Sequence, residues 1–176
     1  MENQRLNKTS LALLVIALLC ACSGKSETTA STTTNGSSAR DIGHITVTGA
    51  ESINGNYGVT QCMVRRPGKS VISGLSVVFD QGEKLKSAEV NLHAYTHDGT
   101  YTIKGDKNVL ATAPVTIDFT SKTSLVQSDA SRTTIIVKDG GASGSATFTN
   151  WQSFDTHKSM SGTLAWQCST VKKLAI

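Results

Sequence analysis

Residues 88–95, AEVNLHAY, indicate the fold class most clearly, because apolar and polar side chains alternate along the whole stretch. The apolar side chains share one face and the polar ones share the other: Ala88, Val90, Leu92 and Ala94 against Glu89, Asn91, His93 and Tyr95. A period of two residues is typical of a β-strand that packs one face on a core and exposes the other to water. We therefore predict a half-buried strand at 88–95.

The same period continues on both sides of this stretch, and no segment shows the spacing of an amphipathic helix. Further strands are predicted at 44–49, 57–64, 74–80, 101–103, 109–119, 133–137, 145–149 and 160–168. Short Gly, Asp and Asn clusters separate them and predict turns at 54–56, 80–82, 98–99, 105–108 and 139–141. About nine short strands with regular turns predict an all-β domain, either an antiparallel β-sandwich or a small barrel.

Two segments depart from this regular pattern. Pro114 has no N–H to donate to a neighbouring strand, so its strand is expected at a sheet edge or at a bulge. Residues 120–131 are polar and predict a loop with one helical turn at 124–127.

The composition argues against nucleic-acid binding. The chain carries 17 Lys and Arg against 13 Asp and Glu, a net charge of +4. Its largest basic clusters are the pairs Arg65-Arg66 and Lys172-Lys173, which do not form the basic stripe that a nucleic-acid interface needs. We therefore expect no nucleic-acid partner.

The N-terminal region contains an apolar run at residues 11–22, LALLVIALLCAC, after a polar and charged head. As a helix this run is about 18 Å long, well short of the ~30 Å hydrocarbon core of a bilayer. It therefore predicts the apolar part of an export signal. A plain secretory signal and a retained membrane helix are the alternatives.

The end of this run, Leu19-Cys20-Ala21-Cys22, resembles the lipobox of bacterial lipoprotein signal peptides. The resemblance implies a signal peptide at 1–21 and acylation of Cys22, palmitate included, at the new N-terminus. Ser23 after that cysteine is compatible with an outer membrane as well as a cell membrane. Membrane lipid, through acylated Cys22, is then the first expected partner.

Residues 22–40 are predicted to form a disordered tether, because positions 23–40 hold five Ser, five Thr and no large apolar side chain. As a flexible coil this stretch spans roughly 23 Å. The β-domain then occupies 41–176. With Cys20 removed and Cys22 acylated, Cys62 and Cys168 remain as one pair in an oxidising compartment, which predicts a disulfide. Two redox-active thiols are the alternative, but the Cys-x-x-Cys spacing is absent.

Catalytic and metal-binding patterns are weak. His93-x-x-x-His97, followed by Asp98, would separate the two Cα atoms by about 13 Å on a strand, so surface histidines are expected. The sequence Gly141-Ala142-Ser143-Gly144 lacks the final glycine of a nucleophile elbow. Asp80 and Glu83 share the turn 80–83, and Asp98 and Asp139 lie beside glycine, so these acids are typical of turns. We expect no enzyme, no catalytic residue, no metal and no cofactor.

Ligand binding remains open. Tyr95 and His93 share the polar face of their predicted strand, and Trp151 lies in the polar stretch 149–152, so these side chains are the candidate ligand-binding residues. The alternative is that the aromatic rings pack on the core or its rim. Trp166, two residues before Cys168, is expected in the core beside the disulfide.

In outline the chain is similar to small surface lipoprotein antigens of bacterial envelopes: a lipobox, a Ser/Thr-rich spacer and a β-domain. The resemblance implies a non-enzymatic, lipid-anchored protein on the outer side of the cell membrane or outer membrane, which binds an unknown protein or glycan or has a structural role. One alternative is an inhibitor of an envelope-degrading hydrolase, similar to lipoprotein lysozyme inhibitors in size, anchor and β content. A carbohydrate-binding module is another, and a hydrolase built on His93, His97 and an acid is the third.

Overall fold

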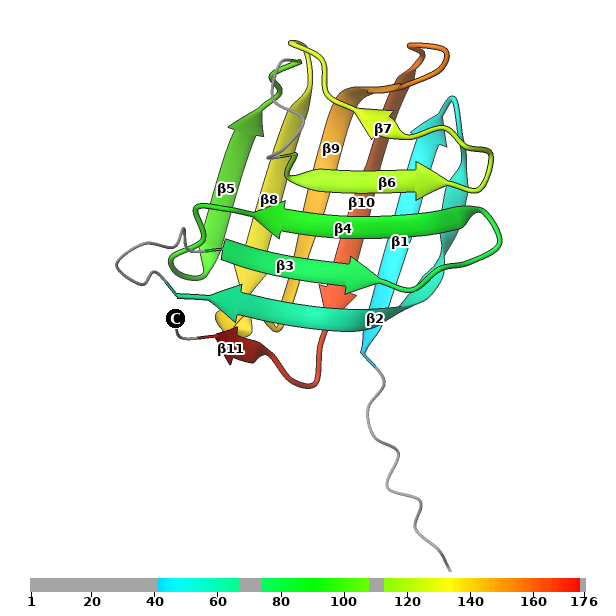
Figure 1. Cartoon of the computed structure of the whole chain (residues 1–176). Helices are drawn as coiled ribbons and strands as arrows, with labels where there is room; N and C mark the ends of the chain where they lie inside the picture. The colour runs from blue at the N-terminus through cyan, green and yellow to red at the C-terminus, as the bar shows by residue number, and fades with distance from the viewer. Residues whose placement is uncertain (1–40, 67–73, 108–112, 175–176) are drawn as a thin grey trace, which may run out of the picture. The chain divides into compact units, whose positions relative to one another are not determined.

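The computed structural model describes residues 41–66, 74–107 and 113–174, so the predicted signal peptide, Cys22 and tether lie outside the described residues. Nine strands pair in one antiparallel sheet (Figure 1), in the order β5 (Gly99–Lys104), β8 (Arg132–Lys138), β9 (Ser143–Ser153), β10 (Ser159–Gln167), β1 (Ile42–Gly49), β2 (Ile53–Arg65), β3 (Gly74–Phe79), β4 (Leu85–Leu92), β6 (Val115–Phe119). Two short strands lie off this path: β7 (Leu125–Val126) pairs with β9, and β11 (Lys172–Leu174) runs parallel to β2. The predicted all-β fold of about nine strands is confirmed.

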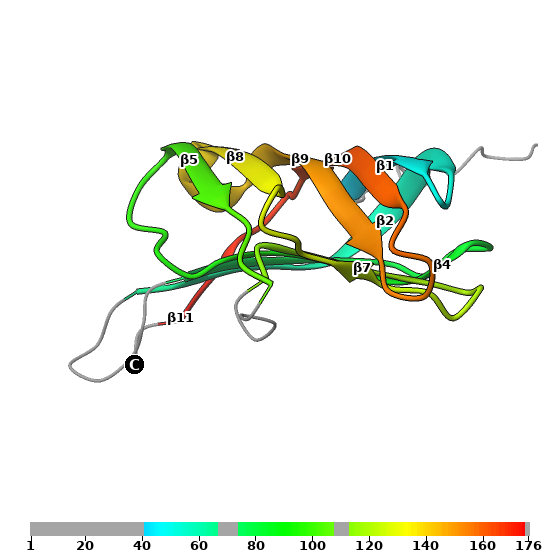
Figure 2. The ribbon, with the colours of Figure 1, turned by 90° about the horizontal axis from the view of Figure 1, so that it is seen from above.

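The long strand β2 folds this sheet into two layers (Figure 2). Its first half, residues 53–58, pairs with β1, and its second half, residues 59–65, pairs with β3. A register shift at Thr60 separates the two halves, as expected where a strand bends from one layer into the next. In Figure 1, strands β3, β4 and β6 run across β5, β8, β9, β10 and β1. The arrangement is a sandwich of crossing layers, and β5 and β6 stand at the two ends of the strand order.

The core lies between the layers and is filled by the inward-facing side chains of both. Ile45 and Val47 of β1 are fully buried, as are Val77 of β3 and Val90 of β4. The largest fully buried side chain is that of Trp151. Burying one such apolar side chain contributes about 1.5–3 kcal/mol, so the period-two pattern is what stabilises the sandwich.

The strand at 88–95 is β4, but it begins and ends three residues earlier than predicted. Ala88 and Leu92 are buried as expected, whereas Ala94 is exposed because the strand ends at Leu92. Pro114 immediately precedes β6, which stands at the end of the sheet order, so the predicted edge position is confirmed.

Three local predictions are wrong. Residues 54–56 are part of β2 and pair with Thr46, Ile45 and His44, while the chain reverses just before, after Gly49 at φ +120°. The stretch 98–99 does not join neighbouring strands, because β4 pairs with β3 and β6 whereas β5 pairs with β8. The segment 124–127 holds β7 instead of a helical turn. In each case pairing with a distant strand determined the backbone conformation.

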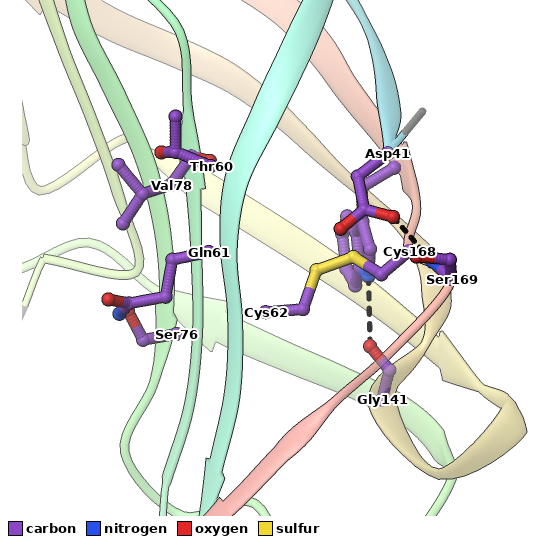
Figure 3. The surroundings of a disulfide bond; sticks show 10 residues. Asp41, Thr60, Gln61, Cys62, Ser76, Val78, Gly141, Cys168 and Ser169 are labelled. Carbon is purple, nitrogen blue, oxygen red and sulfur yellow. Dashed lines mark hydrogen bonds between the residues drawn. A yellow bond between two sulfur atoms is a disulfide. The ribbon is translucent and has the colours of Figure 1, made fainter. Parts of the chain in front are cut away.

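The predicted disulfide is confirmed. Cys62 of β2 and Cys168, directly after β10, are joined across a sequence separation of 106 residues, with their Cα atoms 6.5 Å apart (Figure 3). Trp166 is buried as expected, and its indole Nε1–H donates to the carbonyl of Gly141, 3.2 Å away. Gly141 has a φ of +94°, and a Cβ there would lie 2.9 Å from the Val64 side chain. The bridge therefore links the two layers at a tightly packed corner.

Candidate functional site

A shallow trough lies on the outer face of the layer that contains the second half of β2 together with β3, β4 and β6. It crosses β2, β3 and β4. It has a volume of about 210 Å³. The cross-strand register places Met63 opposite Ser76 and Ser76 opposite Asn91. The trough is lined by side chains from neighbouring strands and by the residue after β4: Gln61, Met63, Arg65, Gly74, Leu75, Ser76, Glu89, Asn91 and His93.

A chain of hydrogen bonds crosses this trough. The Gln61 Nε2–H donates to Ser76 Oγ at 3.5 Å, and the Ser76 hydroxyl donates to Glu89 Oε1 at 2.8 Å. All three side chains are half-buried, and the Glu89 carboxylate forms no ion pair with a described residue. The trough therefore presents a carboxylate and a side-chain amide, held in place by a serine, on rigid strands.

Gly74 opens one end of the trough. It lies opposite Arg65 in the β2–β3 register, and a Cβ at Gly74 would lie 3.8 Å from the Cα of His93. A side chain at Gly74 would therefore contact the backbone at Leu92 and His93. Arg65, Gly74 and His93 together line this end of the trough.

Of the candidate ligand-binding residues, His93 is exposed and lines the trough. His97 does not join it there. The His97 ring lies 6.4 Å from the ring of Tyr101 in β5, and its Nδ1–H donates to the backbone carbonyl of Asp98 at 2.6 Å. Among residues 41–66, 74–107 and 113–174, no group of three or more His, Cys, Asp or Glu is arranged to hold a metal ion.

Tyr95 is buried, with 6% of its surface exposed, so it does not lie on the polar strand face where the sequence placed it. Since β4 ends at Leu92, the chain turns, and the Tyr95 N–H donates to the Leu92 carbonyl at 3.3 Å. The Tyr95 hydroxyl donates to Asp98 Oδ1 at 3.0 Å, and the same carboxylate accepts the Gly140 N–H at 2.9 Å. Burial, together with the bond to Asp98, raises the pKa of Tyr95 to about 12.

Trp151 is fully buried and therefore presents no ring surface to a ligand. Its indole N–H donates to Thr133 Oγ1 at 3.1 Å, and its ring packs edge-on against Phe148, with centroids 6.0 Å apart. Met160 pairs with Trp151 and Gly162 with Phe148, so two residues of β9 face one of β10. This bulge, with Asn150 at φ +56°, turns Trp151 inward. Tyr95 and Trp151 are thus both buried, which is the alternative that the sequence left open.

The acids beside glycine serve local structure, as expected. Asp98 accepts the Gly140 N–H, and Asp139 accepts the Ser143 hydroxyl. Neither carboxylate converges with His93 in the trough. None of the helices formed by described residues has the length and apolarity to span a bilayer.

The chain matches no protein-family model, no curated protein and no solved structure. The trough residues Gln61, Ser76 and Glu89 were not predicted as site residues. Each occupies a polar position on a period-two strand, which marks it as facing outward. Their adjacency depends on the pairing register of three strands, which local sequence does not contain.

Proposed function

We propose that this protein is a lipid-anchored, non-enzymatic binding protein on the outer side of a bacterial membrane, and that its ligand occupies the trough on β2, β3 and β4. The observation that supports binding best is the hydrogen-bonded row Gln61–Ser76–Glu89 inside that trough. The lipobox resemblance supports the anchor. The Cys62–Cys168 bridge agrees with an oxidising, extracytoplasmic compartment.

The trough chemistry favours a ligand rich in hydroxyl or amide groups. Gln61 and Asn91 supply amides that donate and accept, and the Glu89 carboxylate accepts. Such groups, held by the sheet, match the neutral polar edges of a glycan or of an extended peptide. Because Tyr95 and Trp151 are buried, recognition of a sugar would depend on hydrogen bonds and not on ring stacking.

The anchor is tested by localisation and by mass. Cys22→Ser, or globomycin treatment, is expected to stop lipoprotein processing and to change the membrane fractionation of the protein. The intact mass of the native protein should show an acylated Cys22 as the first residue. An unmodified Met1, or unchanged processing in the variant, would contradict the lipoprotein proposal.

The ligand is tested by screening the protein on a glycan array and, in parallel, by affinity capture from an envelope extract. Glycan hits identify a carbohydrate-binding module, and a single stoichiometric hydrolase identifies the inhibitor. Either interaction should weaken by about ten-fold in Glu89→Gln, the loss expected for one charge-assisted hydrogen bond. Glu83→Gln, which removes the same charge from an exposed position outside the trough, is the matched control and should leave binding unchanged. Equal losses in both variants would place the ligand elsewhere.

A further inference from the structure

The fold brings together the two dibasic pairs that are far apart in the sequence. Arg65 ends β2 and Arg66 follows it directly, and Lys172 and Lys173 begin β11. Parallel pairing places Lys172 beside Met63, Lys173 beside Val64 and Leu174 beside Arg65, and the Arg66 N–H donates to the Leu174 carbonyl at 3.2 Å. These four cations, Arg65, Arg66, Lys172 and Lys173, form what we call the basic corner.

The basic corner has no acidic partner among the described residues. Among the described residues an ion pair joins Lys107 to Asp129, away from the basic corner. No described acid forms an ion pair with any of the four cations. The Asp98 carboxylate accepts hydrogen bonds from the Tyr95 hydroxyl and the Gly140 N–H, and it forms no ion pair with any of the four cations. Like charges on neighbouring strands repel, so a bound anion would stabilise this pairing.

The disulfide holds the corner together. Cys62 lies three residues before Arg65 in β2, and Cys168 lies four residues before Lys172. The covalent bridge thus fixes β2 beside the segment that leads into β11 (Figure 3). The backbone segments that carry the four cations therefore stay close together.

A pocket of about 190 Å³ opens between these cations. Arg65, Arg66 and Lys173 line it together with Val64, Tyr95, Thr96 and Gly140. We infer that this pocket binds a phosphate group. A phosphate monoester carries a charge of about −1.5 to −2 and three strong acceptor oxygens, which matches the three cationic residues in the lining of the pocket, whereas a carboxylate carries one charge. Guanidinium groups bind phosphate through paired N–H donors.

Two sources can supply this phosphate monoester: the headgroup of phosphatidic acid or a soluble phosphate compound. The lipid source rests on the proposed lipid anchor. The Ser169 N–H donates to Asp41 Oδ1 at 2.6 Å, so the start of the domain touches the segment that leads into β11. Figure 1 shows the start of β1 and β11 at the same lower edge of the sandwich. With the proposed lipid anchor ahead of residue 41, the basic corner would lie on the side of the domain where the anchor joins it.

The test uses the full chain in neutral detergent and follows backbone amide NMR signals at constant ionic strength. Inorganic phosphate is the first probe and should cause saturable shifts at Thr96, Gly140 and Lys173. Arg66→Gln/Lys173→Gln should weaken this binding at least about ten-fold for each cation removed. Lys86→Gln/Lys104→Gln removes the same charge from exposed positions on β4 and β5 and should change the affinity by less than about two-fold.

A second arm measures sedimentation of the same protein with vesicles of phosphatidylcholine, with and without phosphatidic acid, whose headgroup is a phosphate monoester. Binding that needs phosphatidic acid and the basic corner identifies a headgroup, and phosphate binding without vesicle binding identifies a soluble ligand. The inference is overturned if neither probe binds saturably, if the control variant loses as much affinity, or if polygalacturonate binds in place of phosphate. The phosphate titration does not depend on Cys22, so it stays informative even if the intact mass shows no lipid.

Discussion

Removing the Cys62–Cys168 bridge is the perturbation whose cost follows most directly from the structure. The bridge closes a loop with a sequence separation of 106 residues. Restricting an unfolded chain to a loop of that length is worth about 4.7 kcal/mol at 25 °C by chain entropy alone, and about 2–4 kcal/mol in typical measurements. We expect Cys62→Ala/Cys168→Ala to lower the free energy of unfolding by about 3–5 kcal/mol, a large share of the usual 5–15 kcal/mol.

The assay is urea unfolding followed by tryptophan fluorescence, with the free energy taken by linear extrapolation. The wild type under reducing conditions is the control, because it keeps both cysteine side chains and loses the cross-link. The difference in unfolding free energy between the oxidised and the reduced wild type isolates the entropy contribution of the cross-link. The m-value of the reduced protein should rise because its unfolded chain expands. A reduced protein within about 1 kcal/mol of the oxidised one would refute the loop-entropy reasoning, since 4.7 kcal/mol is the expected limit.

Three further predictions concern single side chains. Thr133→Val removes the acceptor of the buried Trp151 N–H and should lower the free energy of unfolding by about 1–3 kcal/mol; an unchanged urea midpoint would contradict that bond. Gly144→Ala puts a Cβ 2.4 Å from a carbon of the Trp166 indole, whereas in Gly55→Ala the nearest atom is 3.6 Å away. Calorimetry should therefore show a loss of about 1–3 kcal/mol of unfolding free energy in Gly144→Ala and little loss in Gly55→Ala. Burial and the hydrogen bond to Asp98 raise the pKa of Tyr95 to about 12. Tyr95 therefore stabilises the fold as the neutral phenol, and this contribution is complete below pH ~10 and is lost as the pH rises towards 12. Urea unfolding from pH 9 to 12 should therefore show a smaller decline in Tyr95→Phe, and parallel curves would be the contrary result.

The secondary structure was predictable where neighbouring residues decide it. The strand at 88–95 corresponds to β4, and the strands predicted on either side of 139–141 correspond to β8 and β9. In these segments apolar side chains recur every second residue, and burying them on one core requires an extended backbone. The hairpin also needed a left-handed conformation, and Gly140 supplies it at φ +66°.

The candidate site residues were less predictable, because small backbone irregularities decide which way a side chain points. A bulge that includes Asn150 reverses the alternation in β9 and buries Trp151. Ending β4 at Leu92 turns Tyr95 towards the core. Sequence alternation assumes an unbroken strand, and a shift of one residue moves every later side chain to the other face.

The sequence alone determined the strand-built fold class, because apolar side chains that alternate with polar ones share one face only on an extended backbone. The pairing of Cys62 with Cys168 was predicted through the lipobox resemblance, which assigns other fates to Cys20 and Cys22, and the structure confirms the bridge. Tertiary structure alone decided that Gln61, Ser76 and Glu89 form one row and that Arg65-Arg66 meets Lys172-Lys173. Those groupings depend on the register between strands distant in the chain. Register is set by the packing of the whole core, and no local stretch of residues encodes it.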